Sequence, residues 1–326
     1  YERVSGTTLQ SVASVVGQSI FTVSSRNVAS HVASLPGVRR ARVITRLPNI
    51  VEIEVEERLP IVVWRTFTGD LLVDDADGIR TFTFNRPSAK NALTIAMWRE
   101  LARVLRELSA DDSLRCVVLR GAGDDAFAAG ADIEEFLEVR TGEEALRMIR
   151  GGWDPFDKLE RLPFPTVALI DGFCMGGGLG LAAECDLRFC SDDARFRMPA
   201  ARLGLGYNSV GVRRFLDVFG LQNTLDIFYT ARIFGAADAL KMGFVSRVEK
   251  PEALDGVVDE WCAMVAGNAP LTLKALKLTV NELGRDAADR NMAAVNAALA
   301  RCYASDDYRE GAAAFMEKRM PVFKGR

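Results

Sequence analysis

The sequence contains few of the residues that most often act as catalytic bases, nucleophiles or metal ligands, namely histidine and cysteine. Its single histidine is His31, so any chemistry in the rest of the chain proceeds without imidazole. This excludes Ser-His-Asp triads, Cys-His pairs and histidine-ligated zinc sites there. The six cysteines include no CxxC pair and stand in apolar surroundings such as Cys116-Val117-Val118-Leu119. We therefore expect buried free thiols in a reducing compartment, and no metal site.

A basic surface and a long apolar run are also missing. The formal net charge is −3 at pH 7, whereas nucleic-acid binding requires an excess of lysine and arginine. No apolar run approaches the roughly 18 residues needed to cross a bilayer. The length of 326 residues, with 49% hydrophobic and 26% charged content, is typical of a globular chain with room for two domains. We therefore predict neither nucleic-acid binding nor a membrane span.

Lysine and cysteine are absent from residues 1–78, and Lys90 is the first lysine of the chain. In Ile50–Glu57 apolar residues alternate with glutamates, which predicts a sheet that helices cover on one side only. The early segment is therefore expected to form a small α+β domain. Its predicted elements are helices at Leu9–Val16 and Ser25–Leu35 and strands at Ile20–Val23, Val38–Thr45, Ile50–Glu57 and Pro60–Arg65.

Strands and helices alternate from Ile79 onward. Such alternation indicates βαβ units with right-handed crossovers. Helical patterns dominate after about Asp217, and the Asp74–Gly78 cluster is the one candidate linker. Two domains are expected, spanning residues 1–78 and 79–326. The predicted elements that open the second domain are strands at Ile79–Asn85, Arg115–Leu119 and Pro165–Ile170 and an amphipathic helix at Thr94–Ser109.

Two loops of small residues leave backbone N–H groups uncovered. In Ala129-Gly130-Ala131-Asp132 the small residues lead to an aspartate that can cap the following helix. In Gly176-Gly177-Gly178 three glycines separate the strand Thr166–Ile170 from a helix. A phosphate cradle is disfavoured for this second loop, because no Lys-Ser/Thr follows the glycines and the GxGxxG spacing is absent. Two N–H donors aimed at a carbonyl oxygen are the better interpretation.

These loops resemble the enoyl-CoA hydratase/isomerase (crotonase) superfamily over residues 79–326. Further motifs support the resemblance, namely Asn85–Leu93, Ala183–Asp186, Leu203-Gly204 and Asn268–Pro270. It implies an α/β fold built as a ββα spiral, with a helical C-terminal region, and assembly into trimers or hexamers. It also implies a cytoplasmic lyase or isomerase of fatty acid metabolism. The substrate is an acyl- or enoyl-CoA thioester, so coenzyme A is part of the substrate and no separate cofactor is expected.

The resemblance also implies the residues of the site. The thioester oxygen is held by the backbone N–H groups of Ala131 and Gly177, which form an oxyanion hole and stabilise an enolate. Two fixed donors in a dry site can contribute several kcal/mol. The implied contacts to coenzyme A lie at Ala89, Lys90, Ala129, Gly130, Asp132, Ile133 and Lys318, the last of these at the 3′-phosphate.

The sequence departs from the family at both catalytic acids. Hydratases of this family use two glutamates, and the matching positions here hold Gly180 and Ala200. Hydration requires a carboxylate to activate water and an acid to protonate the α-carbon. Asn208 stands where dienoyl-CoA isomerases place a catalytic aspartate and can orient water, and Tyr207 can donate a proton. Arg202 can receive a substrate carboxylate in a fork, although an arginine after an Ala-Ala turn is more often a surface or trimer-contact residue.

Residues 1–78 resemble the POTRA domain of the bacterial division protein FtsQ. The resemblance rests on the order helix, strand, helix, strands and on the segments Leu35–Val43 and Val55–Ile61. In that family the domain follows a membrane anchor and mediates protein contacts outside the cytoplasm. Because the two resemblances belong to different compartments, the chain is expected to be a fusion.

Three functions remain open from the sequence. The first is a crotonase-type enzyme with a non-standard acid and base. The second is decarboxylation of a malonyl-type thioester, because loss of CO₂ generates the enolate without a base. The third is an interaction protein that acts through its first 78 residues.

Overall fold

The computed structural model describes residues 24–25, 28–29, 32, 38–46, 50–57, 60–65, 70–132, 134–135, 155–207 and 209–326. The chain forms two compact units, which divide between Ile61 and Val62 rather than at residue 78. The predicted helix Leu9–Val16 and strand Ile20–Val23 lie outside the described residues, as does His31. None of the described helices combines the length and the apolar character needed to cross a membrane.

The first unit contains an antiparallel hairpin of β1 (Val38–Arg46) and β2 (Ile50–Glu57). Ile53 and Val55 of this hairpin pack against Val28 and Val32, which are buried. The glutamates of β2 lie on the opposite face, where Arg46 forms a 3.0 Å ion pair with Glu52. The predicted one-sided sheet is confirmed for these two strands.

The second unit is built on a seven-stranded sheet with the order β13-β10-β8-β6-β5-β4-β3. The strands from β5 to β13 are parallel, and β4 pairs with β5 antiparallel. The three strands that the sequence predicts after residue 78 are confirmed within a few residues. The strands are β3 (Pro60–Arg65), β4 (Asp70–Ala76), β5 (Ile79–Asn85), β6 (Cys116–Gly121), β8 (Thr166–Ile170), β10 (Leu187–Ser191) and β13 (Arg247–Glu249).

The Asp74–Gly78 cluster is a hairpin turn and not a linker. Strand β4 runs to Ala76 and β5 begins at Ile79, with Ala76 paired to Ile79. Asp77 (φ 54°) and Gly78 (φ 78°) both have left-handed backbone, as a two-residue turn of type I′ requires. Leu71 and Val73 of β4 are buried in the main core. The chain before residue 79 therefore supplies an integral strand of the second unit.

A second sheet of four short strands, in the order β12-β11-β9-β7, completes each turn of the spiral. A strand of the large sheet is followed along the chain by one of the small sheet: β6 by β7, β8 by β9, and β10 by β11. Two strands per turn with crossing helices give the expected ββα spiral. The small sheet consists of β7 (Ala126–Ala128), β9 (Phe173–Met175), β11 (Arg195–Arg197) and β12 (Phe234–Gly235).

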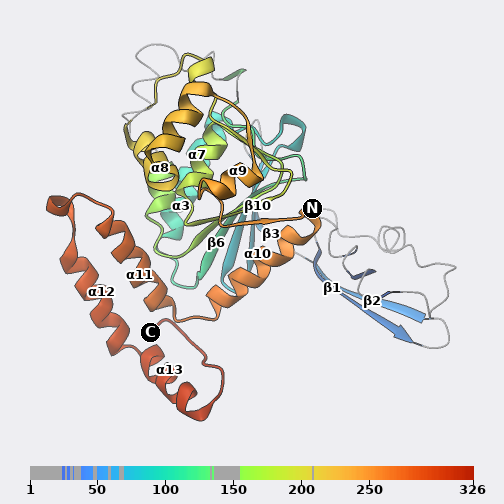
Figure 1. Cartoon of the computed structure of the whole chain (residues 1–326). Helices are drawn as coiled ribbons and strands as arrows, with labels where there is room; N and C mark the ends of the chain where they lie inside the picture. The colour runs from blue at the N-terminus through green and yellow to red at the C-terminus, as the bar shows by residue number, and fades with distance from the viewer. Residues whose placement is uncertain are drawn as a thin grey trace. The chain divides into compact units, whose positions relative to one another are not determined.

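Helices cover this core and then extend away from it as a helical arm (Figure 1). The helices of the body are α3 (Ile95–Leu108), α6 (Pro155–Glu160), α7 (Gly177–Glu184), α8 (Ser209–Thr230, kinked at Gly220), α9 (Ala236–Lys241) and α10 (Pro251–Ala266). The arm consists of α11 (Pro270–Leu283), α12 (Met292–Ala304) and α13 (Asp306–Glu317). Single 3₁₀ turns occur at Pro87–Ala89, Ala200–Arg202 and Ala287–Asp289. The predicted helical C-terminal region is confirmed.

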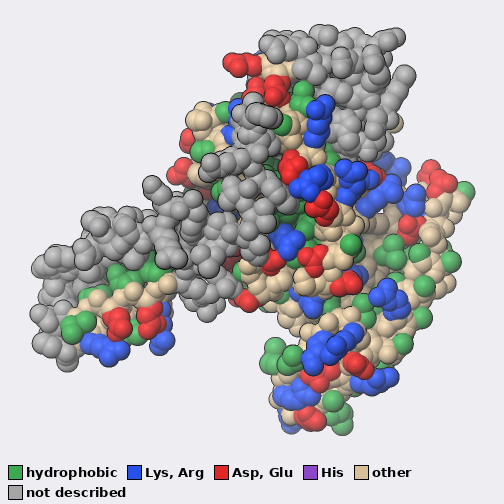
Figure 2. All heavy atoms as spheres, turned by 180° about the vertical axis from the view of Figure 1, so that it is seen from behind, with side chains coloured by type: hydrophobic (Ala, Val, Ile, Leu, Met, Phe, Trp, Pro, Cys, Tyr) green, Lys and Arg blue, Asp and Glu red, His purple; other side chains and the backbone are tan. Residues whose placement is uncertain are grey.

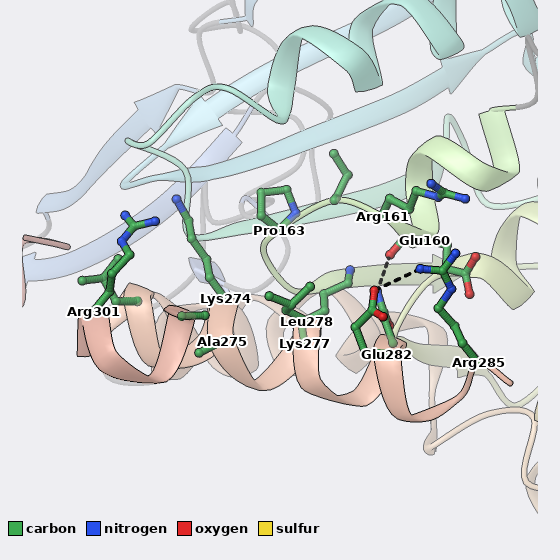
Figure 3. A pocket seen from close by; sticks show the side chains of 14 residues that line it. Glu160, Arg161, Pro163, Lys274, Ala275, Lys277, Leu278, Glu282, Arg285 and Arg301 are labelled. Carbon is green, nitrogen blue, oxygen red and sulfur yellow. Dashed lines mark hydrogen bonds and ion pairs between the residues drawn. The ribbon is translucent and has the colours of Figure 1, made fainter. Parts of the chain in front are cut away.

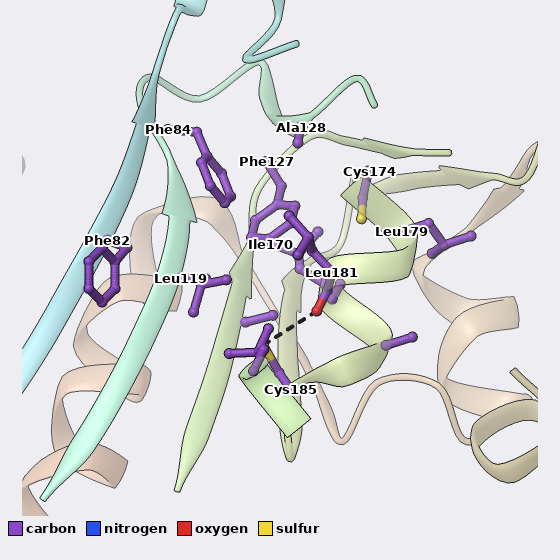
Figure 4. Close-up of a cluster of buried hydrophobic side chains, with 14 of the residues drawn as sticks. Phe82, Phe84, Leu119, Phe127, Ala128, Ile170, Cys174, Leu179, Leu181 and Cys185 are labelled. Atoms are coloured by element: carbon purple, nitrogen blue, oxygen red, sulfur yellow. Dashed lines mark hydrogen bonds between the residues drawn. The ribbon is translucent and has the colours of Figure 1, made fainter. Parts of the chain in front are cut away.

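The short helix α7 is embedded in the core between the two sheets (Figure 4). Its side chains Leu179 and Leu181 are fully buried. The guanidinium of Arg188 donates from Nη1 to the carbonyl of Cys185 at 2.6 Å and to that of Ala182 at 3.2 Å. Burial lowers the pKa of Arg188 to about 10. Bonded to these last carbonyls of α7, Arg188 fixes the helix axis and, with it, the position of the N-terminus.

The cysteines and the surface agree with the composition. All six cysteines are free, and only Cys302 is not fully buried. Figure 2 shows lysine and arginine side chains interspersed with aspartate and glutamate over the described part of the face in view. No single-sign basic surface that would attract nucleic acid is formed on that part of the face.

Candidate active site

The two segments that carry small residues are held side by side by backbone hydrogen bonds. Ala129 N–H donates to the carbonyl of Lys90 at 2.9 Å, and Leu93 N–H donates to the carbonyl of Gly130 at 2.8 Å. Asn91 is fully buried, and its Nδ2 donates to the carbonyl of Ala126 at 2.6 Å. These bonds fix the backbone around Ala131 against the segment that precedes α3.

The backbone N–H groups of Ala131 and Gly177 lie next to each other. A Cβ placed on Gly177 would lie 3.7 Å from the nitrogen of Ala131, and one placed on Gly130 would lie 3.3 Å from the nitrogen of Gly177. Neither N–H donates to an acceptor in the part of the chain that the structure describes. The structure thus brings together two unused donors from loops that are distant in sequence.

The glycines of the second loop are required by close packing. A Cβ on Gly177 would lie 2.9 Å from Cζ2 of Trp98, and one on Gly178 would lie 2.5 Å from the carbonyl oxygen of Ala128. Gly176, with φ 51°, is the N-cap of α7. The N–H of Gly177 is therefore at the first turn of a helix, where the partial positive charge of the helix dipole favours an oxygen that gains negative charge.

Position 180, where the family's first glutamate would stand, is closed by aromatic rings. A Cβ on Gly180 would lie 3.2 Å from both Cε1 and Cζ of Phe156. The hydroxyl of Tyr207 would lie 3.9 Å from the same Cβ. The Phe156 ring packs on Trp98 with 5.4 Å between centroids. A proton donor, Tyr207, thus stands beside the place of the missing acid.

Sequence reasoning missed Phe156 and Trp98. Both stand in amphipathic helices, where an aromatic residue is the ordinary sign of core packing. Tyr207 is a predicted proton donor, and its ring packs on Phe228 with 5.2 Å and on Phe215 with 6.4 Å between centroids. No sequence pattern indicates that these rings meet at Gly180, because the contact joins α6, α7 and the segment before α8.

The remaining polar and acid positions that the sequence suggests are not shown beside the N–H groups of Ala131 and Gly177. Ala200 is buried and opens a 3₁₀ turn. Arg202, two residues later, is exposed, as expected for a surface or interface residue. Asn208 lies outside the described residues. Glu135 accepts a hydrogen bond from Ile95 N–H at 2.6 Å and so serves the start of α3.

The expected coenzyme A contacts fall into two groups. Lys90 is exposed, has left-handed backbone (φ 49°), and holds its Nζ 4.4 Å from the centroid of the Phe173 ring. Ala89, Lys90, Ala129, Gly130 and Asp132 belong to the paired segments beside the two free N–H groups. Lys318 is exposed at the end of α13, on the arm that lies away from α7 (Figure 1). Ile133 lies outside the described residues.

The carboxylate of Asp132 has structural partners. It accepts from Nη1 of Arg86 at 2.9 Å and from the N–H of Glu134 at 3.2 Å. The hydrogen bond from Arg86 lowers the pKa of Asp132 below its ordinary value. The predicted capping role of Asp132 is confirmed, and its carboxylate holds the loop that contains Ala131.

A separate cavity of about 450 Å³ lies between α11, α12 and the segment after α6 (Figure 3). Two of its cations are matched by anions: Lys277 lies 2.7 Å from Asp186, and Arg285 lies 3.2 Å from Glu282. Neither Ala131 nor Gly177 lines it. Among the described residues no cluster of histidine, cysteine, aspartate and glutamate could hold a metal ion.

Comparison of the sequence with models of known families identifies the family of the second unit. Residues 74–326 match the model of the family described as enoyl-CoA hydratase/isomerase. The chain belongs to this family. A short-chain enoyl-CoA hydratase of Clostridium acetobutylicum is 33% identical over 258 residues, 79% of this chain and 98% of the relative. A crotonyl-CoA hydratase of Syntrophomonas wolfei is 30% identical over 254 residues, 78% of this chain and 97% of the relative.

Solved structures show the same fold. An enoyl-CoA hydratase/carnithine racemase from Magnetospirillum magneticum is 35% identical with a TM-score of 0.73, over 78% of this chain and 96% of that protein. The match to a crotonase-type fold over residues 74–326 agrees with the two-sheet spiral and the helical arm. Separately, residues 7–58 match the model of the FtsQ-type POTRA domain, which supports the resemblance seen in the sequence.

Proposed function

We propose that the second unit binds an acyl- or enoyl-CoA thioester and reacts it through an enolate held by the N–H groups of Ala131 and Gly177. The observation that carries the proposal is the adjacency of these two donors, which lack acceptors among the described residues. A thioester α-carbon is weakly acidic, so a reaction through its enolate needs the oxygen stabilised. Donors fixed before the reaction supply this without reorganisation.

In this proposal, groups other than the usual two glutamates donate and accept the protons of the reaction. With Gly180 and Ala200 at the two acid positions, Tyr207 is the donor closest to the place of the first acid. In this proposal its hydroxyl protonates the enolate carbon or the leaving group, and Asn208 orients water. A phenol is a weaker acid than the carboxylic acid that it replaces, so hydration is expected to be slow.

Decarboxylation of a malonyl-type thioester is the second candidate. The observation that favours it is the Phe156 ring, which would lie 3.2 Å from a Cβ on residue 180 and so crowds a side chain there. Loss of CO₂ breaks the C2–C3 bond and leaves its electron pair on the enolate, so no base is required. The enolate then takes one proton, which Tyr207 is proposed to donate.

Coenzyme A is proposed to bind along Ala89, Lys90, Ala129, Gly130, Asp132 and Ile133. Lys318 is remote from these residues within one chain, so we propose that it reaches the 3′-phosphate from a neighbouring copy in a trimer or hexamer. The arm offers an apolar surface for such a contact: Tyr303 is 69% exposed, Phe315 83% and Met316 81%. Large exposed apolar groups gathered on one element mark interaction surfaces.

The first unit is proposed to contact a protein partner, as POTRA domains do. The enzyme unit is proposed to act in the cytoplasm, and a POTRA-like unit would ordinarily act outside it, which agrees with a fusion of two parts. A third possibility follows, in which the chain is an interaction protein and the thioester pocket has no turnover.

A panel of CoA thioesters, assayed by mass spectrometry for binding and turnover, separates these alternatives. Crotonyl-CoA, a dienoyl-CoA and malonyl-CoA test hydration, isomerisation and decarboxylation. Turnover of at least one of them is the expected result. Binding without turnover of any of them would favour the interaction protein, and absence of binding would contradict the proposed function.

A further inference from the structure

The indole N–H of Trp98 is a buried donor that the proposed chemistry leaves unused. Trp98 lies in the first turn of α3, and 5% of it is exposed. Its Nε1 has no hydrogen-bond acceptor among the residues that the structure describes. An indole nitrogen can only donate, and buried tryptophan N–H groups usually find a partner. Such a donor indicates a place for an acceptor other than the described residues, and a bound ligand can supply it.

The indole ring lies against the two backbone donors. Its Cζ2 would be 2.9 Å from a Cβ on Gly177, and the nitrogen of Ala131 would be 3.7 Å from that same Cβ. Cη2 would be 3.4 Å from that Cβ, so the benzo edge of the indole faces Gly177, and Nε1 is two bonds from Cζ2. Phe156 packs on the ring with 5.4 Å between centroids and holds its orientation. The indole that carries the unpaired N–H therefore packs beside the two backbone donors.

We propose that Trp98 Nε1–H donates to an oxygen on C3 of the acyl group and so selects thioesters that carry one. The inference rests on the proposed function, in which Ala131 and Gly177 hold the oxygen on C1. In a planar 1,3-dicarbonyl the oxygens on C1 and C3 can lie on the same side of the chain. A donor next to the oxyanion pair is therefore placed to meet the second oxygen. C3 is the ketone carbon of a 3-oxoacyl group and the carboxylate carbon of a malonyl group.

A thioester without this oxygen leaves the Trp98 donor unsatisfied. Sites built to hydrogen-bond a polar group discriminate against analogues that lack it, because their own buried group then loses its partner. We expect acetoacetyl-CoA to bind about tenfold more tightly than butyryl-CoA, which has the same chain length. Malonyl-CoA and propionyl-CoA form the second pair, and a carboxylate is the stronger acceptor.

Calorimetry on the full chain with these four thioesters and free CoA tests the proposal. The Trp98→Phe variant keeps an aromatic ring against Gly177 but lacks the N–H. Its acetoacetyl/butyryl affinity ratio is expected to fall to within about twofold of one, with butyryl-CoA binding retained. A preference confined to the first pair identifies the 3-oxo group, and one confined to the malonyl pair identifies the carboxylate. Either supports the proposal.

Two further variants test whether a change in the shape of the pocket, rather than loss of the N–H, explains the result. Benzothienylalanine at position 98 keeps the bicyclic ring with sulfur in place of N–H and should also abolish the preference. Trp261→Phe, on α10 where Trp261 packs 6.0 Å from Phe189, should leave it unchanged. A wild-type ratio near one, or a ratio that survives in both position-98 variants, overturns the inference while the proposed function stands. If no thioester binds more tightly than free CoA, the proposed function fails and this inference with it.

Discussion

Removing a single N–H from the oxyanion pair is possible by substitution at Gly177. Gly177 is the first residue of α7, the position where proline fits a helix best because that N–H has no intrahelical partner. Gly177→Pro deletes the donor. Gly177→Ala keeps it and places the same Cβ 2.9 Å from Trp98 Cζ2. The two variants therefore share the contact of the Cβ with Trp98, and they differ in the N–H and in the proline Cδ that replaces its hydrogen.

The size of the effect follows from the role of the donor. Loss of one oxyanion-hole donor ordinarily costs about 10²–10³ in rate, or about 2.7–4 kcal/mol. The same interaction stabilises the enolate of bound acetoacetyl-CoA against its neutral form. Since one pKa unit corresponds to about 1.4 kcal/mol, losing one donor should raise the apparent pKa of the bound ligand by about 2–3 units.

The ultraviolet absorbance of the enolate gives this pKa directly, without any need for turnover. In wild type and in Gly177→Ala the enolate of bound acetoacetyl-CoA should form at a lower pH than in free solution. In Gly177→Pro most of that lowering should disappear, while binding of free CoA is unchanged. Equal enolate titrations for the proline and alanine variants would refute the assignment of Gly177 N–H to the thioester oxygen.

Two further predictions concern the missing acids and the first strand. The double change Gly180→Glu and Ala200→Glu alone should not raise crotonyl-CoA hydration, because a Cβ at residue 180 would already lie 3.2 Å from the Phe156 ring, which crowds a longer side chain there. Adding Phe156→Ala should raise it by about 10²-fold or more, followed as loss of enoyl absorbance, and equal rates for both variants would contradict the steric account. A fragment of residues 62–326 should keep acyl-CoA binding, whereas a fragment of residues 79–326 loses β4 and should be destabilised by roughly 3–6 kcal/mol of burial. Equal thermal midpoints for the two fragments would show that β4 is dispensable.

Much of the fold is predictable from local pattern. Strand β5 has the predicted bounds, and the helix predicted at Thr94–Ser109 is α3, which Thr94 and Ser109 cap. These elements combine strong periodicity with clear end signals. The Asp74–Gly78 cluster was misread as a linker because a run of aspartates before glycine is typical of both a linker and a tight turn. Only pairing of Leu71–Ala76 with β5 separates the two.

The site could be predicted only in its backbone part. The small-residue loops around Ala131 and Gly177 have a sequence signature because side chains there would collide with neighbouring backbone and rings. The aromatic contacts of Gly180 with Phe156 and Tyr207 have no such signature. They arise where three elements meet in space, and each residue alone is an ordinary core residue.

The central claim is that the second unit recognises the thioester of an acyl-CoA through the N–H groups of Ala131 and Gly177. Calorimetry of the full chain with acetoacetyl-CoA and with free acetoacetate tests it most directly. The account predicts binding of acetoacetyl-CoA with a dissociation constant in the micromolar range, about 1–100 µM, and no binding of acetoacetate. Equal and negligible heats for both ligands would contradict it.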